Sequence, residues 1–165
     1  KLILTKDLIA VVMKKDKKNI VYVFLFVLII FSKSYADQNN NFLSLKNNKV
    51  NLRQGPSFEH PIKFIYKKKY LPVVILDKSE TWRKIMDFEN NTGWIHISQL
   101  TKKKSGINKK DNSIMYEKPT IYSKPLAKLE RGRLVLIIKC KKKWCKTKTG
   151  NFTGWIIKDF LWGKI

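Results

Sequence analysis

The side chains that could support covalent or acid–base chemistry in this chain are two cysteines and two histidines, namely Cys140, Cys145, His60 and His96. Nucleophilic catalysis needs a base beside the nucleophile, and neither histidine stands near a cysteine in the sequence. His96 lies between two isoleucines, so strand alternation predicts that it faces solvent, and His60 precedes a proline in a predicted loop. The histidines also lack metal-ligand spacing to the cysteines. We therefore expect no catalytic residues, no metal site and no cofactor.

The cysteine spacing Cys-x4-Cys is typical of a pair facing each other across a hairpin. If Lys142 and Lys143 form a two-residue loop, Cys140 and Cys145 stand opposite each other where the strands approach most closely. The sequence therefore predicts a Cys140–Cys145 disulfide. Because the closed loop is short, the expected stabilisation is only about 2 kcal/mol.

Two segments repeat one pattern at a period near sixty residues, which indicates a repeated structural unit. In each, a Trp opens a strand-like run, a Gly-Trp-Ile step follows a polar turn, and a Leu stands six residues after the second Trp. The offsets between Trp82 and Trp144, Gly93 and Gly154, and Leu100 and Leu161 are 62, 61 and 61 residues. A repeated small unit without catalytic residues favours a binding module over an enzyme.

The first 36 residues have the pattern of an export signal. Four lysines follow Met13, a twelve-residue apolar run spans Ile20 to Phe31, and Ser34 and Ala36 give a small-x-small cleavage site. The run is shorter than the roughly twenty residues that cross a bilayer, so we expect cleavage after Ala36, with an uncleaved anchor as the alternative. Residues 1–12 precede this pattern and are assigned no role.

The rest of the chain predicts an all-β fold. Val50–Arg53, Leu71–Leu76, Trp82–Phe88 and Gly93–Ile97 are expected strands, and the run Leu71–Leu76 is expected to be buried on both faces. Residues 37–44 are polar and expected to fray. The predicted architecture is two small, partly open barrels in tandem: residues 42–100 and 113–165, joined by a lysine-rich linker at 101–112.

Three segments of the first repeat resemble the bacterial SH3-like domain: NLRQGPS at 51–57, the Trp82 strand, and GWIHISQL at 93–100. The end of the second repeat, GWIIKDFLWGKI after CKKKWC, is similar to the last copy in exported bacterial proteins that carry two such domains. The resemblance covers residues 42–165, but the start of the second copy lacks the Arg-x-Gly-Pro-Ser signature. It implies SH3-like barrels in exported modules that bind cell-wall peptides or protein partners.

Aromatic residues are the best candidates for ligand binding, because small barrels bind peptides in aromatic-walled grooves. The tryptophans are most simply core or barrel-closing residues, with Trp162 packing one copy against the other. The hypothetical groove lies beside the turn that follows the first predicted strand, and its expected residues are Arg53, Gly55, Phe58, Tyr66, Tyr70, Trp82 and Trp94. Since only the first copy keeps Arg53 and the Gly-Pro-Ser turn, we expect it to recognise the ligand and the second copy to support it.

The formal net charge of +23 favours anionic partners, such as a membrane surface. Only four of the 35 basic residues are arginine, the residue that contacts phosphates and base edges in pairs of hydrogen bonds, so no specific nucleic-acid binding is expected. The sequence thus predicts an exported, periplasmic or envelope-located binding module for cell-wall peptide or an envelope protein. The alternatives are a cell-wall hydrolase or its targeting subunit, and a lysine-rich scaffold on anionic lipid.

Overall fold

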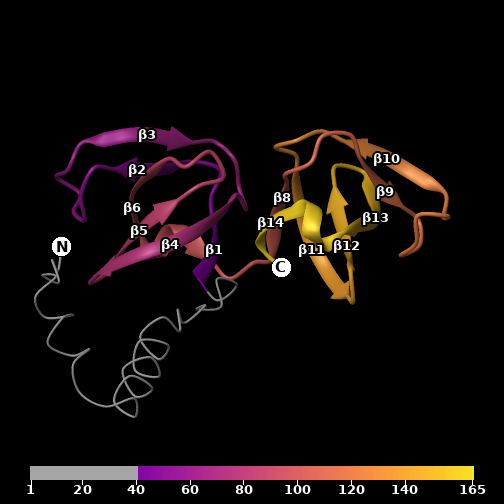
Figure 1. Ribbon diagram of the computed structural model, residues 1–165. Helices are drawn as coiled ribbons and strands as arrows, with labels where there is room; N and C mark the ends of the chain where they lie inside the picture. Colours follow the sequence, from indigo (N-terminus) through magenta and orange to yellow (C-terminus); the bar gives the residue numbers. More distant parts are fainter. Residues whose placement is uncertain (1–40) are drawn as a thin grey trace, which may run out of the picture. The chain divides into compact units, whose positions relative to one another are not determined.

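The computed structural model describes residues 41–165, which belong to a compact unit spanning Gln38–Ile165 (Figure 1). The predicted signal segment lies outside the described residues. Within them the fold is all-β, as predicted, and consists of two seven-stranded antiparallel sheets. None of the helices in this part of the chain has the length and apolar character to cross a membrane.

The first sheet contains β1 (Phe42–Leu45), β2 (Val50–Arg53), β3 (Ile62–Tyr66), β4 (Pro72–Ser79), β5 (Trp82–Met86), β6 (Thr92–His96) and β7 (Leu100–Thr101), with the 3₁₀ turn η2 (Ile97–Gln99) before β7. The second contains β8 (Ser105–Asn108), β9 (Ser113–Tyr116), β10 (Pro125–Leu129), β11 (Leu134–Lys141), β12 (Trp144–Thr149), β13 (Phe152–Ile157) and β14 (Leu161–Lys164), with η3 (Lys158–Phe160) before β14.

The strand orders are β3-β2-β6-β5-β4-β1-β7 and β10-β9-β13-β12-β11-β8-β14, so adding seven to each strand number of the first sheet gives the second. The sequence repeat is therefore a repeat of topology. The end strands of each sheet are not paired with each other, which makes both barrels partly open, as predicted.

Each sheet encloses its own core. Alternation along β2 turns Val50 and Leu52 inward, where they pack with Ile85 and Ile95. The second core contains the corresponding Ile156 together with other apolar residues, namely Met115, Leu129, Val135, Ile137, Cys145 and Leu161. Both Gly-Trp-Ile steps thus place their isoleucine in a core.

The structure differs from three sequence-based expectations. Residues 42–45 are not frayed but form β1, and the predicted linker at 101–112 contains β8, whose four residues are all buried. The run Leu71–Leu76 is not buried on both faces, because Leu76 is 49% exposed. Serines hid the two strands from the apolar pattern: the buried Oγ atoms of Ser44 and Ser105 form a hydrogen bond of 2.7 Å with each other.

A glycine contact explains why Gly-Trp-Ile is repeated. A Cβ on Gly93 would lie 2.7 Å from Leu52 Cγ and 2.8 Å from the Arg53 carbonyl oxygen, closer than any side chain is tolerated. Gly154 has the same contact, with Met115 and the Tyr116 carbonyl oxygen. Only glycine therefore lets β2 meet β6, and β9 meet β13, at this distance.

The disulfide prediction is confirmed. Lys142 and Lys143 form the loop between β11 and β12, Cys140 and Cys145 are direct cross-strand partners, and their sulfur atoms are bonded. Lys142 adopts a φ of 52°, which lets two residues close the loop.

Trp162 packs across the two sheets, as the sequence suggested. The Trp162 ring on β14 lies 5.0 Å from the Phe42 ring and 5.6 Å from the Phe88 ring, centroid to centroid. This contact adds buried area to two cores that are each small for a stable domain.

A buried carboxylate organises the turn between β5 and β6. Asp87 accepts hydrogen bonds from the backbone N–H groups of Glu89 and Asn91, at 2.9 and 2.8 Å, and from the Tyr66 hydroxyl at 3.0 Å. Burial, and then the charge of Asp87, raise the pKa of Tyr66 well above its usual range. Tyr66 thus holds a turn in the fold.

We predict that Gly93→Ala lowers the free energy of unfolding by about 2 kcal/mol or more, because the new methyl group overlaps β2. Gly106→Ala is the matched control: its Cβ would meet neighbours at ordinary contact distances, starting at 3.4 Å, so we expect a change below about 1 kcal/mol. Urea denaturation of both variants measures the difference. Equal effects would refute the close-contact explanation.

We also predict that Tyr66 makes stability fall at high pH. The raised pKa keeps the folded phenol protonated, whereas an unfolded Tyr releases its proton above about pH 10. The contribution is therefore fully present below pH 10, and above it the free energy of unfolding falls by about 1.4 kcal/mol per pH unit. Tyr66→Phe removes this dependence, and because lysine titration is common to both proteins, their difference isolates Tyr66. Parallel stability–pH curves between roughly pH 9 and roughly pH 11 would contradict the assignment.

Candidate functional site

A surface cavity of about 220 Å³ opens in the first sheet, and we call it the Phe58 groove. It is lined by residues of β2, the turn after β2, β5, β6 and η2, namely Lys49, Asn51, Arg53, Phe58, Trp82, His96, Ser98 and Gln99. Several strands thus contribute side chains to one concave surface, as is usual for ligand sites.

Three aromatic rings form the wall of the groove. The Phe58 ring centroid lies 4.9 Å from that of Trp82 and 5.4 Å from that of His96, and the Trp82 and His96 rings are 5.3 Å apart. Trp82 and His96 meet because they are direct cross-strand partners on β5 and β6. Trp82 is 6% exposed and Phe58 is 68% exposed, so a buried ring supports a ring that is open to a ligand.

The turn that carries Phe58 is fixed by its own polar contacts. The guanidinium of Arg53 donates to the His60 carbonyl oxygen at 2.7 Å, and Ser57 Oγ is hydrogen-bonded to His60 Nδ1 at 2.7 Å. A Cβ on Gly55 would overlap the His60 ring, so the glycine of this signature leaves room for the imidazole. The turn is therefore held in place before any ligand binds.

The electrostatic character of the groove is cationic. The Arg53 guanidinium carbon lies 5.7 Å from the Phe58 ring centroid, and the exposed Lys49 stands on the same surface. Arginine carries five N–H donors, of which one binds His60, so others can bind an incoming carboxylate. The arrangement suits a ligand with an apolar or planar part beside an anionic or carbonyl group.

The structure brings three of the seven predicted ligand residues, Arg53, Phe58 and Trp82, into the groove, and Gly55 supports its turn. Tyr66 is bound to Asp87 instead. Trp94 lies in a separate shallow cavity with Gln54, Lys63 and Lys84.

Tyr70 also lies outside the groove. It has a φ of 63°, and its N–H donates to the Leu45 carbonyl oxygen at 2.8 Å. Gly132 makes the same contact to Asn108 in the second repeat, with a φ of 82°. A turn that suits glycine thus carries a tyrosine in the first repeat, at a backbone cost of about 1–2 kcal/mol.

Sequence reasoning missed His96 as part of the groove. Its imidazole is not free in solvent but half-buried, and its Nδ1 is hydrogen-bonded to Ser98 Oγ at 2.8 Å. The hairpin register of β5 and β6 was the signal that could have found it, since that register pairs His96 with Trp82.

The groups considered for catalysis have structural partners. Both cysteines are in the disulfide, so neither offers a thiolate. Each histidine contacts a serine, and the hydrogen bonds of the described residues include no carboxylate on either ring. Residues 41–165 contain no group of three or more His, Cys, Asp or Glu side chains placed to hold a metal ion.

The second repeat carries different residues at the corresponding positions. Tyr116 pairs with Trp155 as Arg53 pairs with Trp94, and Ile157 pairs with Trp144 as His96 pairs with Trp82. The guanidinium and the imidazole of the groove are thus replaced by a phenol and an aliphatic group.

Three solved structures are similar to this chain at low levels. They are NlpC2 and NlpC1 from Trichomonas vaginalis, at 14% and 16% identity, and an NlpC/P60 family protein from Bacillus cereus ATCC 10987, at 13%. The alignments cover 74%, 79% and 73% of this chain but 47%, 47% and 55% of those chains, each with a TM-score of 0.34. The chain thus spans about half the length of these proteins. A comparison with curated protein sequences finds no match.

Family comparison matches both repeats separately. Residues 46–102 and residues 109–163 each match the bacterial SH3 domain, and together these segments cover well over half of the chain. Each segment coincides with one of the two sheets. The chain belongs to the bacterial SH3 domain family, of which it carries two copies.

Proposed function

We propose that this protein is a non-catalytic, exported binding module whose first repeat binds a peptide of the cell wall or of an envelope protein in the Phe58 groove. The observation that supports this most strongly is the exposed Phe58 ring, held against Trp82 and His96 beside the Arg53 guanidinium. An exposed aromatic ring on a braced turn is typical of peptide recognition by small barrels.

The chemistry of the groove favours a short peptide with a free carboxylate. The cavity of about 220 Å³ has room for a few side chains but not for a large folded surface. The rings offer apolar contact, whereas Arg53 and Lys49 offer charge to a carboxylate. Short wall peptides carry both kinds of group.

Export is supported by the disulfide, because disulfides persist in oxidising compartments outside the cytosol. The signal pattern of residues 13–36 supports the same location. We propose a periplasmic or envelope location on these two grounds.

A targeting subunit of a cell-wall hydrolase would use the same groove and is compatible with this proposal. A hydrolase that acts through the cysteines is disfavoured, because both sulfur atoms are bonded to each other.

We predict that Phe58→Ala and Arg53→Ala each weaken retention of residues 38–165 on purified peptidoglycan by about tenfold. Phe58→Ala is the cleaner test, because a side chain that is 68% exposed can be truncated without opening the core. Arg133→Ala, an exposed arginine of the second repeat, is the matched control and should retain full binding.

The double variant Cys140→Ser, Cys145→Ser tests the roles of the two repeats. It should lower the melting temperature and leave retention nearly unchanged, because the disulfide lies in the second repeat. Undiminished retention of both Phe58→Ala and Arg53→Ala would refute the groove as the binding site.

A further inference from the structure

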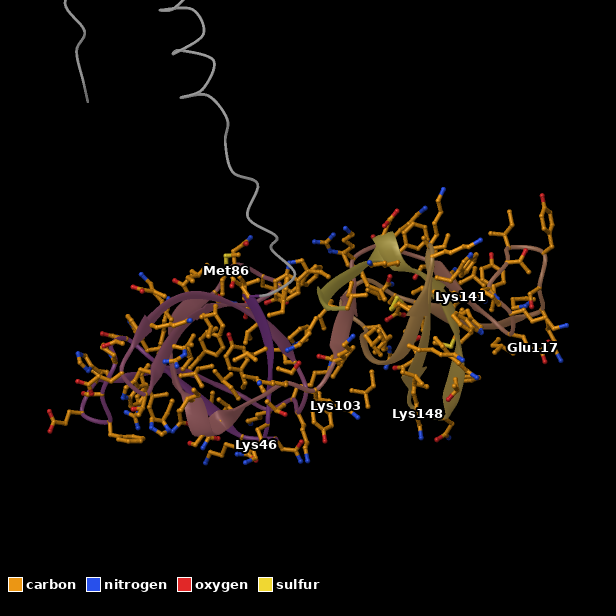
Figure 2. The ribbon with its side chains drawn as sticks, turned by 90° about the horizontal axis from the view of Figure 1, so that it is seen from below. Lys46, Met86, Lys103, Glu117, Lys141 and Lys148 are labelled. Carbon is orange, nitrogen blue, oxygen red and sulfur yellow. A yellow bond between two sulfur atoms is a disulfide. The ribbon has the colours of Figure 1, made fainter. Side chains whose placement is uncertain are left out.

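The hairpin of β11 and β12 carries a concentration of lysines at its tip. We define the lysine tip as residues 139–146, which contain Lys139, Lys141, Lys142, Lys143 and Lys146 around the disulfide. Four of these lysines are exposed and Lys146 is half-buried. Figure 2 labels Lys141, at this tip, and Lys148, farther along β12.

The first repeat provides an internal comparison, because its β4–β5 hairpin has the same register. Asp77 pairs with Lys84 where Lys139 pairs with Lys146. Glu80 begins the two-residue loop with a φ of 46°, where Lys142 has a φ of 52°. Both acidic residues of the first hairpin thus correspond to lysines in the second.

A general excess of lysine in the chain does not explain this contrast, because both hairpins belong to the same chain. The first tip balances its charges across the strands, whereas the second has none to balance: no Asp or Glu occurs between Glu130 and Asp159. The difference is therefore local to one tip.

The lysine tip also has an energetic cost. Lys139 and Lys146 are like charges directly opposite each other, an arrangement that destabilises a strand pair. The adjacent Cys140–Cys145 disulfide holds the strands together despite this repulsion. The charges are thus held on a rigid hairpin instead of being dispersed.

The shape of the tip selects the kind of partner. A hairpin loop with consecutive lysines projects from the sheet and offers no pocket of its own, so it suits an extended anionic surface more than a small ligand. Trp144, half-buried and paired with Lys141, adds an indole of the kind that sits at the headgroup level of membranes.

We propose that the lysine tip of the second repeat docks on a membrane surface rich in anionic phospholipid. Lysines near such a surface contribute through attraction to phosphate headgroups, and ordinary salt screens this attraction. The second repeat thereby holds the protein at the membrane while the groove of the first repeat faces its own ligand.

The test is cosedimentation of residues 38–165, a compact unit that excludes the apolar run of residues 20–31, with two kinds of vesicle. One is pure phosphatidylcholine and the other contains phosphatidylglycerol. We expect binding only to phosphatidylglycerol vesicles, lost at high salt.

The informative variant gives the second tip the acids of the first. Lys139→Asp with Lys142→Glu should weaken vesicle binding by about 30-fold, on the basis of about fivefold for each lysine contact. Lys67→Asp with Lys68→Glu changes the net charge equally at exposed positions of the first repeat and should weaken binding less than about threefold. Melting temperatures check that both variants are folded.

Three outcomes would overturn the proposal. They are equal losses in the two variants, the absence of binding to phosphatidylglycerol vesicles, and binding to soluble polyphosphate that exceeds vesicle binding. The last result would assign the tip to a soluble polyanion instead of a membrane.

Discussion

Both sheets depend on a glycine that lets two strand backbones approach at a single point. Gly93 lies against Leu52 and the Arg53 carbonyl oxygen, and Gly154 lies against the corresponding residues of β9. At this point β2 and β6 pair through one residue each, Arg53 and Trp94. The sheet can fold back on itself only because no Cβ separates the strands there. The following isoleucine then enters the core, which links the curvature of the sheet to its hydrophobic packing.

The same contact determines where the groove lies. It places the end of β2 beside β6, so that the turn after Arg53 covers the pair of rings formed by Trp82 and His96. The second repeat keeps the contact and the tryptophans but replaces Arg53 and His96 by Tyr116 and Ile157. The frame is therefore constant between copies, whereas the surface residues differ. Such a division is expected when packing constrains the glycine and the core, and function alone constrains the surface.

The sequence predicted those features that follow from local patterns. The repeat, the second hairpin with its disulfide and the burial of the Gly-Trp-Ile isoleucines follow from spacing and strand alternation. The strands β1 and β8 did not, since Ser44 and Ser105 are buried through a hydrogen bond between residues 61 positions apart, which no local pattern encodes. His96 was assigned to solvent because alternation shows which face a residue occupies, but not that Phe58 covers that face. Tyr66 was misassigned because its partner, Asp87, lies on a distant turn.

The central claim is that the first repeat binds its ligand in the Phe58 groove. Backbone and indole NMR shifts of residues 38–165, followed while soluble peptidoglycan fragments are added, test it most directly. Binding in the groove predicts saturable shifts at Arg53, Phe58, His96 and the indole N–H of Trp82, with little change at Trp144 and Trp155. Saturable shifts confined to the second repeat, or none at the highest ligand concentration, would contradict the claim.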